Sequence, residues 1–378
     1  MAADAQDIEE LRDGYGPRHA SALVGHAGAE ARLLALWNSG RMPHAVMLAG
    51  PEGIGKATLA YRFARFVLAE GRTQADAAAA GGGLFGDAPP APTSLALQPD
   101  HPVFRRVAAA SHADLFVAER AWNDKTGRLR SEIGVDDVRE LGAFFALTAG
   151  EGLWRVAIVD AVDQLNRSSA NALLKVLEEP PARALLLLVC HAPGAVLATI
   201  RSRCQRIDLR ALDAEDAAKV IAQNLPDALP ESVAMLARLA EGRPGRAVRL
   251  AVEDGAAIYA KMTQLLSSLP DLDVGAVHAL GDAVARKPAA FLTLGELLGG
   301  WLQRMIRLRA GAAPAAEVIA GEAAAMARLG ATLGLERWIE VWEKVARFFE
   351  RADAVNLDKK QVVIASFDIL ERASRGVA

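Results

Sequence analysis

The segment at 46–66 combines residue types that bind phosphate groups. It contains Gly50, Gly53, Gly55 and Lys56, which fit the G-x-x-x-x-G-K part of the phosphate-loop (P-loop) signature. Glycines at these places let backbone N–H groups turn toward phosphate oxygens, and the lysine brings a positive charge to the terminal phosphates. The spacing predicts a nucleotide-binding loop, although glycine-rich turns after strands also occur for structural reasons alone.

The residue after the lysine departs from this signature. A P-loop NTPase carries Ser or Thr there as a ligand of Mg²⁺, whereas this chain has Ala57. Thr58 offers a hydroxyl one position later, but successive helical positions are rotated by about 100°, which turns that oxygen away from the metal. The loop is therefore predicted to be degenerate. No cofactor is required by this interpretation, and binding of ATP or ADP stays open.

A second candidate site follows an apolar run within 154–166. The run ends in Asp160, and Asp163 comes three residues later. In P-loop proteins an acid at the end of such a strand helps to hold Mg²⁺. A water-activating glutamate is expected directly after it, and this chain has Ala161. Two positions needed for hydrolysis are thus alanine, which predicts a site without ATPase activity; the alternative is a buried strand that merely ends in Asp.

Metal-binding residues are sparse in this sequence. Cys190 and Cys204 are its only cysteines, too few for a disulfide framework or a four-thiolate zinc site. His101 and His112 have no cysteine near them in the sequence. We therefore expect no zinc and no other metal, and this cysteine usage fits a reducing cytoplasm.

The bulk composition describes an ordinary globular chain. With 378 residues it has room for about two to three domains. A net charge of −3 and aromatic residues at 5% give neither a basic field nor a stacking platform for nucleic acid. The first residues lack a secretory-signal pattern, and no apolar run reaches the roughly 18 residues of a membrane helix. We expect no membrane contact, and any DNA contact to be shared with partners.

Strand and helix patterns alternate through the first half of the chain. Strands are predicted at 46–49, 114–120, 154–160, 184–190 and 207–209, and helices at 27–39, directly after the P-loop, at 133–147 and at 168–179. This alternation predicts an open α/β sheet, and the continuous apolar run at 184–190 predicts a parallel strand that is buried on both faces.

Changes in composition predict the domain boundaries. Residues 1–18 are polar and are predicted to form a flexible N-terminal arm, followed by an α/β P-loop domain at 19–211. Ala, Gly and Pro dominate 71–99, which predicts a low-complexity surface insertion. Only amphipathic helical patterns follow, in two predicted units at 212–257 and 258–378.

Apolar stripes at helical spacing mark the last of these units. They contain Trp301, Met305, Trp338, Val341, Val345 and Phe349. One interpretation is core packing within the chain. The other is a helical surface that also packs against other subunits.

Three motifs together indicate a family. GPEGIGKAT at 50–58, ANALLKVLEEPP at 170–181 and IRSRC at 200–204 resemble the corresponding motifs of bacterial clamp-loader AAA+ proteins. The resemblance covers roughly residues 20–250. It implies an AAA+ α/β domain, a small helical lid at 212–257 and a helical collar domain for oligomerisation after it. Because two catalytic positions are alanine, the chain is most similar to the subunit that does not hydrolyse ATP.

The resemblance also implies roles for two arginines. In the family, the arginine that corresponds to Arg203 acts as an arginine finger in trans, at the ATP site of a neighbouring motor subunit. Such an arginine stabilises charge on the transferring phosphoryl group. Arg246 is similar to a second sensor arginine, which would contact a phosphate at this chain's own site. From the residues alone, Arg203 as an ordinary surface ion-pair partner stays open.

The implied function is structural and regulatory. The chain would belong to the DNA polymerase III holoenzyme and help to load the sliding clamp onto primed DNA, without a competent ATPase or polymerase site of its own. Its direct partners would be the motor (tau/gamma) and delta subunits. The alternatives are an autonomous AAA+ ATPase motor in replication or repair, against which Ala57 and Ala161 argue, and a nucleotide-sensing adaptor outside replication.

Overall fold

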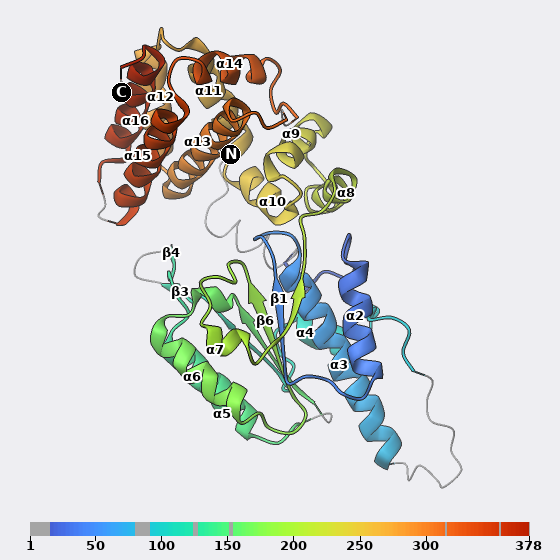
Figure 1. Ribbon diagram of the computed structural model, residues 1–378. Helices are drawn as coiled ribbons and strands as arrows, with labels where there is room; N and C mark the ends of the chain where they lie inside the picture. Colours follow the sequence, from blue (N-terminus) through green and yellow to red (C-terminus); the bar gives the residue numbers. More distant parts are fainter. Residues whose placement is uncertain are drawn as a thin grey trace. The chain divides into compact units, whose positions relative to one another are not determined.

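The chain forms two compact units, each with its own hydrophobic core (Figure 1). The α/β unit comprises the described residues up to Val220 together with Gly242–Gly245, and the helical unit comprises Ile221–Glu241 and the described residues from Arg246 onward. The computed structural model describes residues 16–79, 91–123, 128–150, 154–313, 316–354 and 357–377. Residues 1–15 of the predicted arm and 80–90 of the predicted insertion lie outside these ranges.

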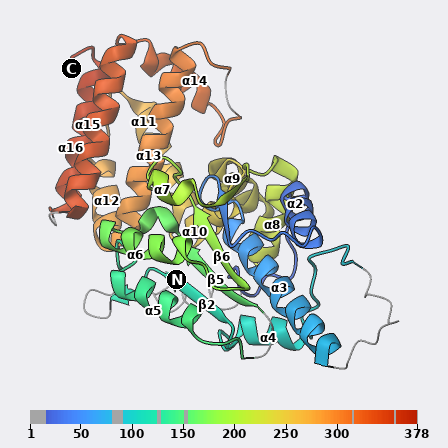
Figure 2. The ribbon, with the colours of Figure 1, turned by 60° about the horizontal axis from the view of Figure 1, so that its bottom comes forward.

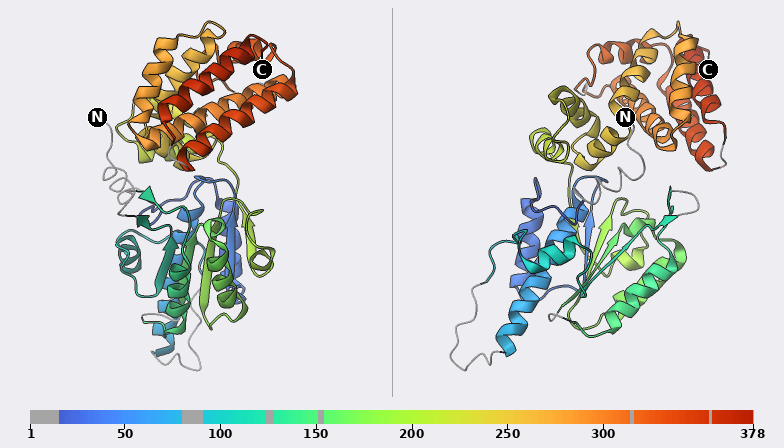
Figure 3. Two further views of the ribbon diagram at one scale, coloured as in Figure 1. Left: turned by 90° about the vertical axis from the view of Figure 1, so that its left-hand side faces the viewer. Right: turned by 180° about the vertical axis from the view of Figure 1, so that it is seen from behind.

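A parallel sheet organises the α/β unit (Figure 3). Its strands are β1 (Ala45–Ala49), β2 (Leu115–Glu119), β5 (Arg155–Asp160), β6 (Ala184–Cys190) and β7 (Gln205–Asp208), in the order β2-β5-β6-β1-β7. The strand before the P-loop therefore lies inside the sheet, between β6 and β7. The register places Ala49 beside Cys190, and Asp160 beside Val189. The carboxyl ends that carry the candidate residues thus meet at one edge.

Helices cover both faces of this sheet (Figure 1). They are α2 (Ala27–Asn38), α3 (Lys56–Ala79) and α4 (Pro102–Ala108) on one side, and α5 (Val135–Ala146) and α6 (Arg167–Glu178) on the other. Along β1, Val46 packs into the first layer and Met47 into the second, so the strand is apolar at every position. The predicted α/β fold class, with its parallel sheet and following helices, is confirmed.

Two boundaries differ from the sequence prediction. The helix α3 continues to Ala79, inside the segment at 71–99, because alanine favours the helix more than any other residue. At the start of the chain, Arg65 of α3 donates hydrogen bonds to the carbonyl oxygens of Arg18 and Ala20. Arg18, the last residue of the predicted arm, is therefore hydrogen-bonded to the α/β unit.

One short hairpin is not predicted from the sequence. β3 (Trp122–Asn123) pairs in antiparallel fashion with β4 (Arg128–Leu129). The strands are only two residues long, so they show no alternating pattern to recognise. Residues 124–127, between the two strands, lie outside the described ranges.

The helical unit is built from helices that share one core (Figure 2). Its elements are α8 (Ala214–Asn224, which begins in the α/β unit), α9 (Pro230–Ala240), α10 (Pro244–Val252, whose first residues also belong to the α/β unit), α11 (Gly255–Ser268), α12 (Val274–Ala285), α13 (Pro288–Arg309), α14 (Glu322–Gly330), α15 (Leu335–Ala354) and α16 (Lys359–Ser374). Leu239 and Leu250, predicted for the lid, belong to the same core as Trp301. Among the described residues, no helix is long and apolar enough to cross a membrane.

The apolar stripes of the last unit face the chain's own interior. Trp301, Met305, Trp338, Val341, Val345 and Phe349 are all at most 6% exposed. The core-packing interpretation of these residues is confirmed. A surface for other subunits must use different side chains.

Candidate functional site

The P-loop joins β1 to α3 in a conformation that depends on its glycines. Gly50, Gly53 and Gly55 have φ angles of +155°, +80° and +103°, which residues with side chains rarely adopt. A Cβ atom at Gly50 would lie 2.4 Å from the carbonyl oxygen of Leu209. The predicted order of strand, loop and helix is confirmed, and the backbone itself requires the glycines of the motif.

Lys56 begins α3 and turns its ammonium group back into the loop. Its Nζ donates hydrogen bonds to the carbonyl oxygens of Gly50, at 2.7 Å, and of Pro51. The residue is 2% exposed. This burial lowers the pKa of Lys56 to about 8, although the charges of Asp160 and Asp163 act in the opposite direction. The lysine is therefore still mostly protonated at neutral pH.

Two aspartates lie at the same edge of the sheet. Asp160 is the last residue of β5. Asp163 accepts hydrogen bonds from the backbone N–H groups of His191, at 2.7 Å, and Ala192, at 3.2 Å, directly after β6. Both carboxylates are near enough to Lys56 to act on its pKa. The structure thus brings together the lysine and the acid that the sequence predicts as partners in phosphate and metal binding.

The oxygens that an NTPase needs for catalysis are missing at both predicted positions. Ala161 is buried, and Ala57 packs against the core between α3 and the sheet. Thr58 is half-buried in the first turn of α3. The first-turn N–H groups of α3 and the lysine can hold a phosphate. The residues that would place Mg²⁺ and activate water are incomplete.

Three further residues at this site escape sequence reasoning. His26 forms a hydrogen bond with the carbonyl oxygen of Ile54 at 2.6 Å. The N–H of Gly245 donates a hydrogen bond to the carbonyl oxygen of Gly53 at 2.9 Å. His191 follows β6, and burial and the charge of Lys56 lower its pKa. Only His191 has a usable signal, because ligand sites gather beyond the carboxyl ends of parallel strands.

The Ser-Arg-Cys turn is fixed by its own side chains. It follows the short helix α7 (Ala198–Arg201). Ser202 and Arg203 donate hydrogen bonds to the carbonyl oxygen of Thr199, at 3.2 Å and 3.0 Å, and the thiol of Cys204 lies 3.1 Å from that of Ile200. The carbonyl oxygen of Ile200 also accepts the backbone N–H of Arg203, at 3.1 Å, and such side-chain and tight-turn bonds are typical of a helix end. The triplet therefore caps α7 and presents Arg203 in a defined place.

Arg203 also forms an ion pair on the surface of the unit. Its Nη2 donates to Oε1 of Glu178 at 3.0 Å, and the side chains are 37% and 52% exposed. Arg201 is different, since its guanidinium binds the carbonyl oxygens of Pro193 and Val196, both at 2.8 Å. Of the two arginines in the motif, Arg201 therefore holds the preceding loop, and Arg203 keeps part of its guanidinium available.

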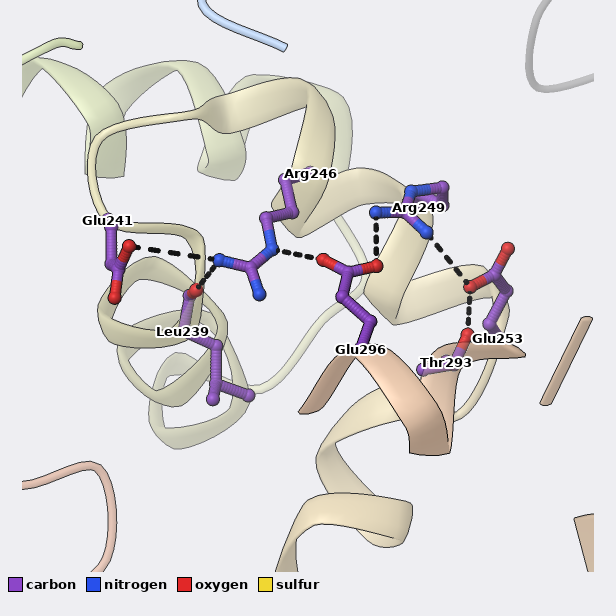
Figure 4. Close-up of polar contacts among 7 residues, drawn as sticks. All are labelled: Leu239, Glu241, Arg246, Arg249, Glu253, Thr293 and Glu296. Atoms are coloured by element: carbon purple, nitrogen blue, oxygen red, sulfur yellow. Dashed lines mark hydrogen bonds and ion pairs between the residues drawn. The ribbon is translucent and has the colours of Figure 1, made fainter. Parts of the chain in front are cut away.

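Arg246 lies in a network of ion pairs within the helical unit (Figure 4). Its Nε donates to Oε1 of Glu296 at 2.6 Å, and Nη1 donates to the carbonyl oxygen of Leu239 at 2.8 Å. Arg249 binds the other oxygen of Glu296 at 2.7 Å. Burial raises the pKa of Glu296, but the two arginines outweigh it, and the pKa is lower than usual. A contact of Arg246 with phosphate stays a prediction.

The two histidines considered for metal binding have local backbone roles. Nδ1 of His101 accepts a hydrogen bond from the N–H of Val103, and Nδ1 of His112 accepts one from the N–H of Asp114. The part of the chain that the structure describes has no group of three or more His, Cys, Asp or Glu residues that could hold a metal ion. The expected absence of zinc stays a prediction.

Comparison with known proteins identifies the family. The family model described as DNA polymerase III, delta subunit, matches residues 97–213. The DNA polymerase III subunit delta' of Yersinia pestis is 31% identical over 256 residues, which cover 64% of this chain and 68% of the relative. The chain belongs to the delta-prime family. The resemblance to a clamp-loader subunit, noted from three motifs, is thereby confirmed.

Two other relatives show how far this similarity extends. The delta' subunit of Pseudomonas aeruginosa is 36% identical over 220 residues, which cover 57% of this chain and 59% of the relative. The DNA polymerase III subunit tau of Escherichia coli is 29% identical over 260 residues, which cover 65% of this chain and 35% of that protein. The matches to these two relatives thus span less than two thirds of their length.

Proposed function

We propose that this chain works as the delta-prime subunit of a DNA polymerase III clamp loader. In this role it hydrolyses no ATP itself and supplies Arg203 as an arginine finger to the ATP site of a neighbouring motor subunit. The turnover of that neighbour would help to place the sliding clamp on primed DNA. Its direct partners would be the motor (tau/gamma) and delta subunits, in the cytoplasm.

One combination of features supports this proposal above all. The chain's own P-loop lacks a hydroxyl at Ala57 and an acid at Ala161, while Arg203 is exposed on a turn whose shape is fixed by hydrogen bonds. A chain that had only lost its ATPase would have no need to hold an exposed arginine in a defined place. A guanidinium so held can act on a phosphoryl group bound by another chain.

Retained nucleotide binding is part of the proposal. The glycine conformations and the inward ammonium of Lys56 keep the parts of a P-loop that hold phosphate. ATP or ADP bound there would have a structural role. Zinc is not needed, since the described histidines that follow the P-loop helix bind backbone groups of their own turns.

The test of the trans arginine is the substitution Arg203→Ala in the reconstituted clamp loader. We expect the ATP site beside this subunit to lose at least about 10²-fold in rate, which corresponds to about 2.7 kcal/mol of transition-state stabilisation. Arg203→Lys should not restore the rate, because an ammonium group lacks the planar fork of guanidinium. The readout is ATPase activity stimulated by clamp and primed DNA, with assembly followed by co-elution.

Arg206→Ala provides the matched control. Arg206 is also exposed and pairs with Asp208 at 2.6 Å, so both variants remove one surface ion pair, a contact that contributes about 0 to 1 kcal/mol. We expect the control to keep the natural ATPase rate and both variants to keep the natural thermal stability. An unchanged rate in the Arg203→Ala complex would refute the trans role.

The rival function, an autonomous ATPase motor, is tested on the isolated chain. We expect turnover below about 0.1 per second, under the usual range of enzymes, because the ligands for Mg²⁺ and water are incomplete. Faster turnover that disappears in Lys56→Ala would favour the motor.

A further inference from the structure

The guanidinium of Arg203 is held from two separate elements. Thr199 of α7 accepts a hydrogen bond from Nη1, and Glu178 of α6 accepts one from Nη2, both at 3.0 Å. A guanidinium has five N–H donors in a planar fork. The two contacts occupy two of them, so three remain for a ligand from outside the unit.

Glu178 is itself placed by the packing of α6. The preceding residue, Leu177, is 3% exposed and lies in the core between the sheet and α5 and α6. The helix ends at Glu178, and Pro180 and Pro181 prevent its continuation. The carboxylate therefore stands at a fixed helix end, beside the turn that carries Arg203.

We infer that Glu178 is a positioning residue for Arg203. This inference rests on the proposed function, because it concerns how the trans arginine is presented to the neighbouring ATP site. An arginine without side-chain partners samples many rotamers, and a catalytic group out of place by about 1 Å can lose much of its effect. Glu178 restricts the guanidinium before the neighbour docks. The carboxylate itself does not touch the phosphate.

Loss of Glu178 should change the rate of ATP hydrolysis at the neighbouring site rather than the affinity of that site for ATP. Arg203 would stabilise charge that develops in the transition state, so its misplacement lowers kcat and leaves KM for ATP nearly unchanged. A group that only stabilised the fold would instead change the melting temperature. An exposed ion pair has little effect on that temperature.

The experiment uses the reconstituted complex with the full-length chain and measures the part of the stimulated ATPase that Arg203→Ala removes. In Glu178→Gln, which keeps the size of the side chain but removes its charge, we expect this part to fall about 5- to 10-fold with KM for ATP unchanged. The neighbouring Glu179→Gln is the matched control and should behave as the natural chain. The double variant Arg203→Ala/Glu178→Gln should be no slower than Arg203→Ala alone, since Glu178 acts only through the arginine.

Each other outcome has a defined meaning. If Arg203→Ala lowers the rate but Glu178→Gln does not, the proposed function stands and the positioning role is refuted. If Arg203→Ala itself has no effect, the trans arginine is refuted first. A faster Glu178→Gln complex would show that the pair restrains the arginine, and a Glu178→Gln chain that no longer co-elutes would show an assembly contact. Both results would overturn the inference.

Discussion

Lys56 is a charged residue that folding removes from water. Its pKa is about 8 in the folded chain and 10.5 in its ordinary state, so the unfolded chain binds more protons between these two pH values. The free energy of unfolding therefore rises with pH across this window. Below pH 8 the lysine is charged in both states and its burial has the full cost, about 3 kcal/mol at roughly 1.4 kcal/mol for each pKa unit.

Lys56→Met tests this cost. We expect the variant to be more stable than the natural chain at pH 7, by about 1–3 kcal/mol, because it no longer buries a charge. The gain is smaller than the full cost of burial, since the carbonyl oxygens of Gly50 and Pro51 lose a hydrogen-bond donor. The difference should shrink between pH 8 and 10.5. Urea unfolding at pH 7 and pH 10 measures it. Lys175→Met, at an exposed lysine of α6, is the control. A stability difference between Lys56→Met and the natural chain that stays constant with pH would contradict the prediction.

Ala57 and Ala161 allow a second test of single residues. We expect Ala57→Ser together with Ala161→Glu to leave the isolated chain without measurable ATPase activity, because an active site of this type also needs an arginine from a neighbouring subunit. A turnover assay with and without Mg²⁺ checks this. Mg²⁺-dependent turnover above about 0.1 per second in the isolated double variant would show that the chain can complete the site alone.

At the scale of elements, Glu296 joins α10 to α13. Its two oxygens bind Arg246 and Arg249, and its side chain is 32% exposed while that of Arg246 is 12% exposed. Removing one partner of a buried charge pair leaves the other partner uncompensated. The partial exposure reduces that cost, so the effect should lie between the values for surface and buried pairs.

Glu296→Gln should therefore destabilise the chain by about 1–2 kcal/mol at pH 7. The pKa of Glu296 is lower in the folded chain than in the unfolded chain, so its contribution is present above the ordinary pKa and is lost as the pH falls through the folded value. Urea unfolding at pH 7 and at pH 3.5 should show a smaller difference at the lower pH. Glu340→Gln, which breaks an exposed pair with Arg337, is the control and should change stability by less than about 0.5 kcal/mol.

At the scale of the whole molecule, the position of a domain boundary has consequences for truncation. The sequence predicts a lid that ends at 257. If that boundary holds, a protein truncated near residue 255 should stay folded but fail to join a clamp loader. The structure places Leu236, Leu239 and Leu250 in one core with the helices that follow. Ending the chain at 255 would expose these residues to water, at about 25 cal/mol for each Å² of apolar surface.

We therefore expect the chain ending at residue 255 to expose apolar surface, while a chain ending at Val220 keeps the α/β core intact. Binding of a hydrophobic dye and size-exclusion chromatography of both truncated chains measure this difference. The full-length chain serves as the reference. A chain ending at 255 that binds no more dye than the full-length chain would show that the lid residues form a separate domain.

Features that depend on neighbouring residues can be predicted from the amino-acid sequence of this protein. Each of these features can be recognised from a few consecutive residues. They are the P-loop glycines, the apolar strands at 46–49 and 184–190, and the alanines at 57 and 161 where an NTPase has side-chain oxygens. Their signals are local because strand and helix periods, and the conformations open to glycine, act along the chain.

Contacts between residues far apart in the sequence depend on the folded chain. Glu178 and Arg203 are 25 residues apart, and Arg246 and Glu296 are 50 apart. No periodic pattern marks such pairs, because they depend on how packed elements bring two surfaces together. The same sequence motif therefore contains Arg201, which binds its own loop, and Arg203, which binds α6. Only the folded chain distinguishes them, since the free energy of each contact depends on the burial and charge that packing creates.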